Sequence, residues 1–84
     1  MKNYEKNLDA EAIHLGRSIK TELKRQGRSA TWLAQQVHCT PENIYKLFMH
    51  QWVAMPLLFN ISLALRHDFF KDCSGYYQEL LEKY

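Results

Sequence analysis

The side chains best able to support catalysis or metal binding in this 84-residue sequence are two cysteines and four histidines. They are Cys39, Cys73, His14, His38, His50 and His67. A zinc site uses ligands at short spacings, such as Cys-x-x-Cys or two His one helical turn apart, and these residues show neither pattern. No nucleophile–base pair and no glycine-rich phosphate loop is present either. The sequence therefore predicts no metal, no cofactor and no enzymatic activity.

His67 and Asp68 are adjacent and resemble a catalytic pair. Asp68, however, directly precedes Phe69 and Phe70, where its carboxylate can accept a hydrogen bond from the first turn of a helix. We therefore predict that Asp68 is a helix cap. Cys39 is expected to be a buried thiol of the core, because free cysteine behaves as a small apolar residue.

No segment of the sequence looks like a membrane or export signal. The N-terminus lacks the apolar stretch of a signal peptide, and the longest nearly apolar run, Val53–Leu65, is too short to span a bilayer. We therefore expect a cytoplasmic protein with reduced cysteines, no membrane partner and no small-molecule substrate.

Basic side chains are concentrated in one part of the chain. Residues 17–28 contain a single acid, Glu22, and five bases: Arg17, Lys20, Lys24, Arg25 and Arg28. Residues 67–84 carry four acids and two bases. Because the net charge of the whole chain is only +2, the basic run is compatible both with a phosphate-facing patch and with an ordinary solvated helix face.

The elements that must position these residues are helices, since apolar residues recur at helical spacing and strand-like alternation is almost absent. We predict one all-α domain. Residues 1–8 are expected to form a flexible arm. A first helix of about four turns is expected to begin after Asp9, to bury Leu15, Ile19 and Leu23, and to end at Gly27.

Two short helices are predicted next. Ser29 is placed to cap a helix over residues 30–37, and Thr40, followed by Pro41, is placed to cap a helix over residues 41–49. Two short capped helices with a three-residue break between them are typical of a helix-turn-helix, here over residues 30–49.

The packing of this motif also follows from residue types. Ala34 is small at the point where the two helices must cross, and Ile44 is apolar in the middle of the second one. With Ile44 directed into the core, its neighbours on the helix face outward and can reach a DNA major groove.

The remainder is also predicted to be helical. Pro56 opens a fourth helix that buries Leu58, Ile61 and Leu65, and Asp68 caps a short helical turn at Phe69 and Phe70. A separate final helix is expected over residues 76–83. We therefore place the domain at residues 9–73 and assign residues 74–84 to an added C-terminal helix for packing or dimerisation.

The stretch from Leu15 to about Phe70 resembles the Cro and phage-repressor class of helix-turn-helix proteins, the XRE class, and most of all its short stand-alone regulators. The resemblance lies in Gly27-Arg28-Ser29, Trp32-Leu33-Ala34-Gln35-Gln36-Val37, Thr40-Pro41-Glu42-Asn43-Ile44-Tyr45-Lys46-Leu47 and Ile61-Ser62-Leu63-Ala64-Leu65. It implies a five-helix repressor-like fold, with the helix over residues 41–49 entering the major groove.

The resemblance also implies which residues contact DNA. They are Arg28, Ser29, Thr40, Glu42, Asn43, Tyr45, Lys46, Met49 and Gln51. By position, Lys46 would contact phosphate or guanine, Asn43 would read adenine and Glu42 would accept from cytosine. Trp52, in the loop that follows, would contact the DNA backbone or pack locally.

Two positions depart from the family pattern. Ala30 stands where the family often has a phosphate-binding Gln. His38 stands where the family usually has Gly, so a left-handed backbone is expected there.

Phe59 and Leu63 are apolar but are not needed to fill the core, because Leu58, Ile61 and Leu65 already do so. We predict that this surplus surface is covered either by the tail, through Tyr77, Leu80 and Leu81, or by a second subunit.

The predicted function is sequence-specific binding of double-stranded DNA by a transcriptional regulator that is a homodimer at least on its DNA site. The alternative is a protein-interaction or antitoxin-like module on the same fold, with weak or no DNA binding.

Overall fold

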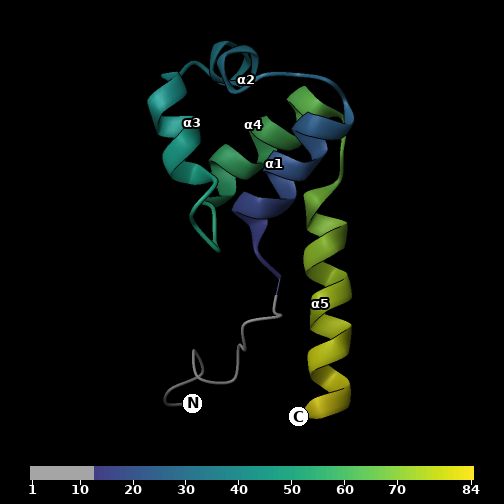
Figure 1. The fold of residues 1–84 in the computed structure, drawn as a ribbon. Coiled ribbons are helices and arrows are strands. Elements are labelled where there is room, and N and C mark those ends of the chain that lie inside the picture. Colours follow the sequence, from purple (N-terminus) through teal and green to yellow (C-terminus); the bar gives the residue numbers. More distant parts are fainter. Residues whose placement is uncertain (1–12) are drawn as a thin grey trace.

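A computed structural model describes residues 13–84, and this part of the chain consists of five α-helices and no β-strand (Figure 1). The helices are α1 (Leu15–Arg25), α2 (Ala30–Gln36), α3 (Pro41–Leu47), α4 (Met55–Leu65) and α5 (Phe69–Lys83). The all-α, five-helix fold expected from the sequence is confirmed.

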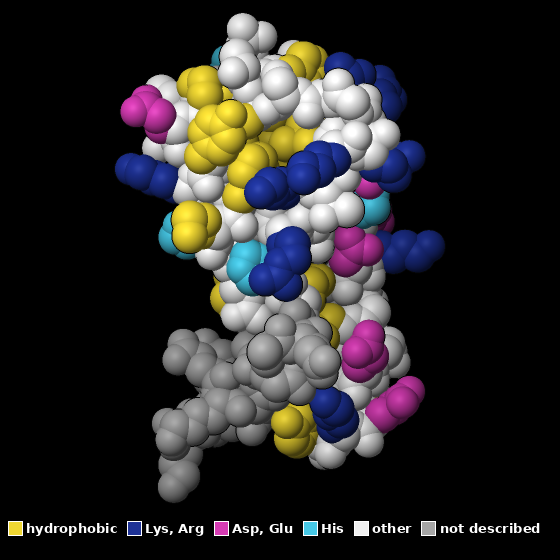
Figure 2. Space-filling model, in the orientation of Figure 1, with side chains coloured by type: hydrophobic (Ala, Val, Ile, Leu, Met, Phe, Trp, Pro, Cys, Tyr) yellow, Lys and Arg dark blue, Asp and Glu magenta, His cyan; other side chains and the backbone are white. Residues whose placement is uncertain are grey.

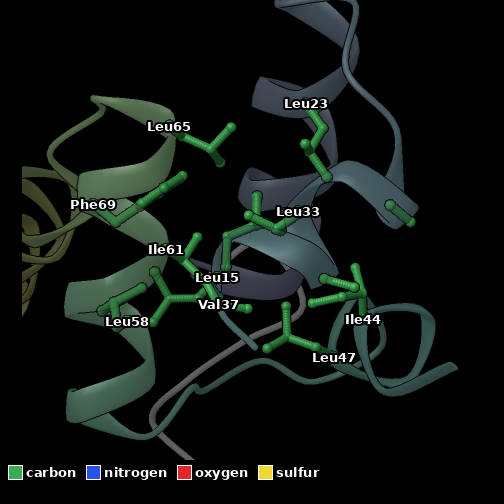
Figure 3. Packing of buried hydrophobic residues seen from close by; sticks show 13 residues of the cluster. Leu15, Leu23, Leu33, Val37, Ile44, Leu47, Leu58, Ile61, Leu65 and Phe69 are labelled. Atoms are coloured by element: carbon green, nitrogen blue, oxygen red, sulfur yellow. The ribbon is translucent and has the colours of Figure 1, made fainter. Parts of the chain in front are cut away.

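The core is formed by apolar side chains that converge from all five helices. Leu33 of α2 is fully buried and lies between residues of α1, α3 and α4 (Figure 3). The core residues that helical spacing predicts, including Ile19, Ile44 and Ile61, are buried. Phe69 adds the first turn of α5 to the same core.

The start of α1 differs from the expectation. Asp9 lies outside the described residues, but α1 begins only at Leu15 and is capped by His14, whose Nδ1 accepts a hydrogen bond from the N–H of Arg17 at 3.0 Å. The N–H of Leu15 donates to the carbonyl oxygen of Gln51 at 2.8 Å. Because the loop after α3 accepts this N–H group, the helix does not continue unbroken from Asp9 into Leu15, and that prediction is wrong. The helix α1 has 11 residues, which is about three turns and not the expected four.

The two capped helices of the predicted helix-turn-helix are confirmed. Ser29 Oγ accepts from the N–H of Trp32 at 3.0 Å, and Thr40 Oγ1 accepts from the N–H of Asn43 at 3.2 Å. His38, in the turn between them, has the left-handed φ of 58° that was expected at this position.

The ends of α2 and α3 differ slightly from the expected ones. α2 ends at Gln36 rather than residue 37, and α3 ends at Leu47 rather than Met49. The N–H of Met49 and the N–H of His50 each donate to a carbonyl oxygen three residues back. This tightens the chain beyond the last α-helical turn.

The C-terminal part is one helix and not a short turn followed by a separate helix. Asp68 caps α5, as predicted, since its Oδ1 accepts from the N–H of Lys71 at 3.0 Å. From Phe69 the helix continues through Gly75 to Lys83. The expected separate helix over residues 76–83 is therefore wrong. The cap and the buried Phe69 start a helix that one glycine does not interrupt.

A polar network joins α1 to the turn between α4 and α5. The Glu22 carboxylate, which is buried, accepts hydrogen bonds from Arg25 and from Gln26 Nε2, the latter at 2.7 Å. Gln26 Nε2 also donates to the carbonyl oxygen of Leu65 at 2.7 Å. The hydrogen bonds from Arg25 and Gln26 lower the pKa of Glu22 to about 2.

His67 extends this network to α5. Its Nδ1 lies 3.7 Å from Glu22 Oε1, and its Nε2 lies 3.0 Å from Asp72 Oδ2. The imidazole thus lies between a carboxylate of α1 and a carboxylate of α5 and links the two helices.

Candidate nucleic-acid interface

The outer face of α3 carries most of the residues expected to contact DNA. Ile44 and Leu47 are buried, so the core holds one side of the helix. The opposite side exposes Glu42, Asn43, Tyr45 and Lys46, and Met49 follows with 82% of its surface exposed. The first four of these side chains provide a carboxylate, an amide, a phenol and an ammonium group, which can hydrogen-bond to base edges or phosphates.

Small residues hold α3 in place. Ala34 of α2 is buried, and its carbonyl oxygen accepts from the N–H of Cys39 at 2.9 Å in the turn that leads to α3. At the other end of α3, Gly16 of α1 lies so close that a Cβ there would be 2.7 Å from the carbonyl oxygen of Phe48. The outer face of α3 is therefore presented by a helix that two neighbouring helices constrain.

Arg28 lies just before α2 and stacks on an aromatic ring. Its guanidinium carbon is 3.9 Å from the ring of Trp32, which is half-buried. A guanidinium over an aromatic ring keeps its N–H groups available, an arrangement suited to phosphate binding. The neighbouring predicted residue, Ser29, is exposed and uses its hydroxyl oxygen as the α2 cap.

Lys20 of α1 is a further candidate for the site. The sequence identified it only as one of the five bases in residues 17–28. Its ammonium nitrogen lies 5.9 Å from the ring of Phe48, and Phe48 meets Tyr45 edge-on with ring centroids 6.0 Å apart. Lys20 therefore stands beside the end of α3. Its distance along the chain from α3 explains why no local pattern could place it there.

Figure 2 shows the face of the molecule on which α1, α2 and α3 are seen. Lys and Arg side chains surround an area of apolar side chains on its upper half, and acidic side chains are fewer there. Residues 13–66 contain seven Lys or Arg and two Glu, a net charge of +5, whereas residues 67–84 have a net charge of −2. The modest charge of the whole chain thus combines a basic segment over residues 13–66 with a slightly acidic segment over residues 67–84.

An open groove of about 410 Å³ runs between α3 and the loop before α4. Its polar rim is formed by Asn43, Lys46, His50 and Trp52. The other residues that line it are apolar: Cys39, Ile44, Leu47, Val53, Ala54 and Leu57. Trp52 and His50 thus join two predicted contact residues in one concave surface.

Two other predicted contact residues have structural roles. Gln51 is half-buried, and its side-chain amide donates to the carbonyl oxygen of Ile13 at 2.9 Å. It therefore ties the loop after α3 to the start of α1. Thr40 is exposed, but its Oγ1 is engaged in capping α3.

The residues expected to cover Phe59 and Leu63 do not do so. Phe59 is 54% exposed and Leu63 is 74% exposed, although both side chains are large and apolar. Tyr77 and Leu81 of α5 are also more than half exposed, and Leu80 is half-buried. These residues lie on α4 and α5, apart from the residues gathered around α3.

The cysteines and histidines are dispersed over residues 13–84. Within that range no three His, Cys, Asp or Glu side chains are placed to hold a metal ion. Cys39 and Cys73 are free and half-buried, so full burial of Cys39 in the core is not observed. Burial raises the pKa of the Cys73 thiol, with Asp72 and Asp68 contributing in the same direction.

None of the helices in the described range is long and apolar enough to cross a membrane. Comparisons with models of protein families, with curated proteins and with solved structures gave no match for this chain.

Proposed function

We propose that this protein binds double-stranded DNA as a sequence-specific transcriptional regulator, with α3 in the major groove. The observation that carries the proposal is the outer face of α3. Lys46 and Asn43 are exposed on a helix whose other side, through Ile44 and Leu47, is locked into the core. A helix held in this way can present its side chains to base edges without the entropic cost of ordering its backbone.

The charge distribution also supports DNA binding. A net charge of +5 over residues 13–66 favours approach to a polyanion. Arg28, over the ring of Trp32, and Lys20, beside Phe48, add two exposed cations next to the α2–α3 unit. Affinity would come mainly from such phosphate contacts, and discrimination between bases from Asn43, Tyr45 and Lys46.

The groove beside α3 provides a place for the DNA backbone. Lys46, His50 and Trp52 on its rim are hydrogen-bond donors, and most of its other lining residues are apolar. A sugar-phosphate strand that left the major groove along α3 would meet donors for its phosphates and apolar surface for its sugars.

Selection of bound duplexes from a random DNA pool, carried out with the full chain at low and at physiological salt, tests the proposal. We expect one sequence to be enriched at both salt concentrations, because base contacts retain specificity when phosphate contacts are screened. A pool that stays random at both concentrations would refute sequence-specific binding.

A second candidate function is that of a protein-interaction or antitoxin-like module. The exposure of Phe59 and Leu63 favours it, and so does the carboxylate of Glu42 on α3, which phosphate would repel. The same selection discriminates between the two functions. A random pool even at low salt would favour the protein-interaction role.

A further inference from the structure

Trp52 is a large aromatic residue that does not pack against the core. It lies in the loop between α3 and α4 and is 49% exposed. The other tryptophan, Trp32, is half-buried, packs against the core and has the guanidinium carbon of Arg28 3.9 Å from its ring. Trp52 therefore offers more free aromatic surface than Trp32 does.

The groove beside α3 places further apolar surface next to Trp52. Leu47, Val53 and Leu57 line this groove together with Trp52. Its volume of about 410 Å³ lies within the range of sites that hold molecules of drug size. A flat ring the size of one nucleobase would therefore fit beside the indole.

The polar residues of the groove favour an anionic ligand. Lys46 contributes an ammonium group and His50 an imidazole, and none of the described residues that line the groove is acidic. Glu42 is exposed on α3 but does not line the groove. The side-chain amide of Asn43 adds a donor and an acceptor that can pair with a base edge. The groove thus combines groups suited to a phosphate with groups suited to a base.

A DNA duplex would leave the aromatic surface of Trp52 unused. The ring faces of paired bases are covered by stacking, so a duplex presents base edges, sugars and phosphates to a protein. An unpaired strand exposes the ring faces of its bases as well. Exposed aromatic side chains beside cations are the combination by which proteins bind single strands. The composition of the groove therefore favours an unpaired strand as a ligand.

We propose that the groove beside α3 also binds single-stranded DNA, with one unpaired base stacked on Trp52 and the adjoining phosphates beside Lys46 and His50. This activity is additional to the duplex binding proposed above. Lys46 and Asn43 belong both to the groove and to the outer face of α3. A single strand and a duplex would therefore compete for the protein.

Tryptophan fluorescence tests the stacking directly. In the Trp32→Phe variant of the full chain, Trp52 is the only tryptophan. An oligothymidylate of about twelve nucleotides, which forms no duplex with itself, should quench its emission as a base stacks on the indole. The control is Trp52→Phe, which retains only Trp32 and should be quenched much less. An unquenched Trp52, or equal quenching of the two tryptophans, overturns the proposal.

Fluorescence anisotropy with a labelled oligothymidylate at low salt measures the contribution of Trp52 to affinity. Trp52→Leu should raise the dissociation constant at least about fivefold, because one base–ring stack is lost. Trp52→Phe, which keeps a ring, should lose less. The matched control is Tyr77→Leu, which removes an exposed aromatic residue of α5 and should have little effect. Circular dichroism checks that each variant keeps its helix content.

Two results of this titration would overturn single-strand binding. One is the absence of binding by the unmodified chain, and the other is equal affinity of correctly folded Trp52→Leu and Tyr77→Leu. A duplex of mixed sequence is the third arm, and Trp52→Leu should weaken its binding less than that of the single strand. An equal loss for the duplex would show that Trp52 contacts only the sugar-phosphate backbone, which also overturns the proposal.

These measurements are separate from those that test duplex recognition. The selection of duplexes can fail while the oligothymidylate still binds and quenches Trp52, and the reverse result is equally distinct. If the chain binds no duplex, the two single-strand measurements decide by themselves.

Discussion

The backbone N–H of Gly16 donates a hydrogen bond to the carbonyl oxygen of His50, with a nitrogen–oxygen distance of 3.0 Å. A Cβ added to Gly16 would lie 2.5 Å from that same oxygen. The first turn of α1 is thus in direct contact with the chain at the end of α3. This contact sets the position of the proposed DNA-reading helix, and it leaves room for a hydrogen atom only.

Replacing Gly16 with Ala should destabilise the protein by about 1–3 kcal/mol, because the methyl group would meet backbone oxygens that cannot move independently of α3. Urea unfolding followed by circular dichroism measures the effect. Gly75→Ala is the matched control, since nothing lies within 4 Å of a Cβ at Gly75 in α5. That change should leave stability unchanged or raise it by up to about 1 kcal/mol. Equal effects of the two substitutions would contradict the close approach.

Thr40→Ala should lower the free energy of unfolding by about 1 kcal/mol, because Thr40 Oγ1 accepts the otherwise unpaired N–H of Asn43 at the start of α3. The control is Thr31→Ala, which removes an exposed threonine inside α2 that is not its cap. Thermal unfolding of both variants compares them directly. A loss at Thr31 as large as that at Thr40 would show that capping is not the cause.

Acidification should weaken the fold through Glu22. Its pKa is about 2 in the folded protein, below its ordinary value of 4.5, because Arg25 and Gln26 hydrogen-bond to the ionised carboxylate. A group whose pKa is lowered by folding stabilises the protein above its unfolded pKa. That stability is lost as the pH falls from about 4.5 to about 2.

The size of this loss should be about 1–2 kcal/mol, since Arg25 is largely exposed and water screens the ion pair. Glu22→Gln should remove the contribution, so the variant should show a smaller fall in stability over the same pH range. Urea unfolding at several pH values measures both curves. Parallel curves for the two proteins would contradict a stabilising role of the ionised carboxylate.

Lys46→Ala should weaken specific DNA binding by about 1–3 kcal/mol and leave the fold intact, because Lys46 is exposed at the centre of the proposed interface. If the ammonium contacts a phosphate, the salt dependence should also decrease by about one released ion. Fluorescence anisotropy with a selected duplex measures both quantities. Lys71→Ala, which removes an exposed lysine of α5, is the control and should have little effect. Unchanged affinity and salt slope for Lys46→Ala would exclude Lys46 from the interface.

Local interactions allowed several features to be predicted from residue types alone. Ser29, Thr40 and Asp68 each accept a hydrogen bond from a backbone N–H three residues further on, so the caps depend only on short stretches of chain. The left-handed backbone at Gly27 follows from its residue type in the same way, whereas that at His38 was expected from the resemblance to the repressor class. The α2–α3 unit and the outward face of α3 follow from these signals and from helical spacing.

Contacts between distant parts of the chain decided the rest. The start of α1 depends on the carbonyl oxygens of His50 and Gln51, which accept the N–H groups of Gly16 and Leu15. Because these oxygens are far away in the sequence, the residues around Asp9 could not show where α1 begins. Gln51, expected at the DNA surface, is instead held by the carbonyl oxygen of Ile13. Neither relationship leaves a periodic pattern in the sequence.

The sequence by itself therefore determined the helical class, the caps of α2, α3 and α5, and the exposed side chains of α3, because each depends on residues within one or two helical turns. The tertiary structure alone decided that α5 is continuous and extends past α1–α4, and that Phe59 and Leu63 stay exposed. Exposure depends on how every other helix packs. For that reason periodicity could identify these two side chains as surplus to the core but could not establish whether the chain's own tail covers them.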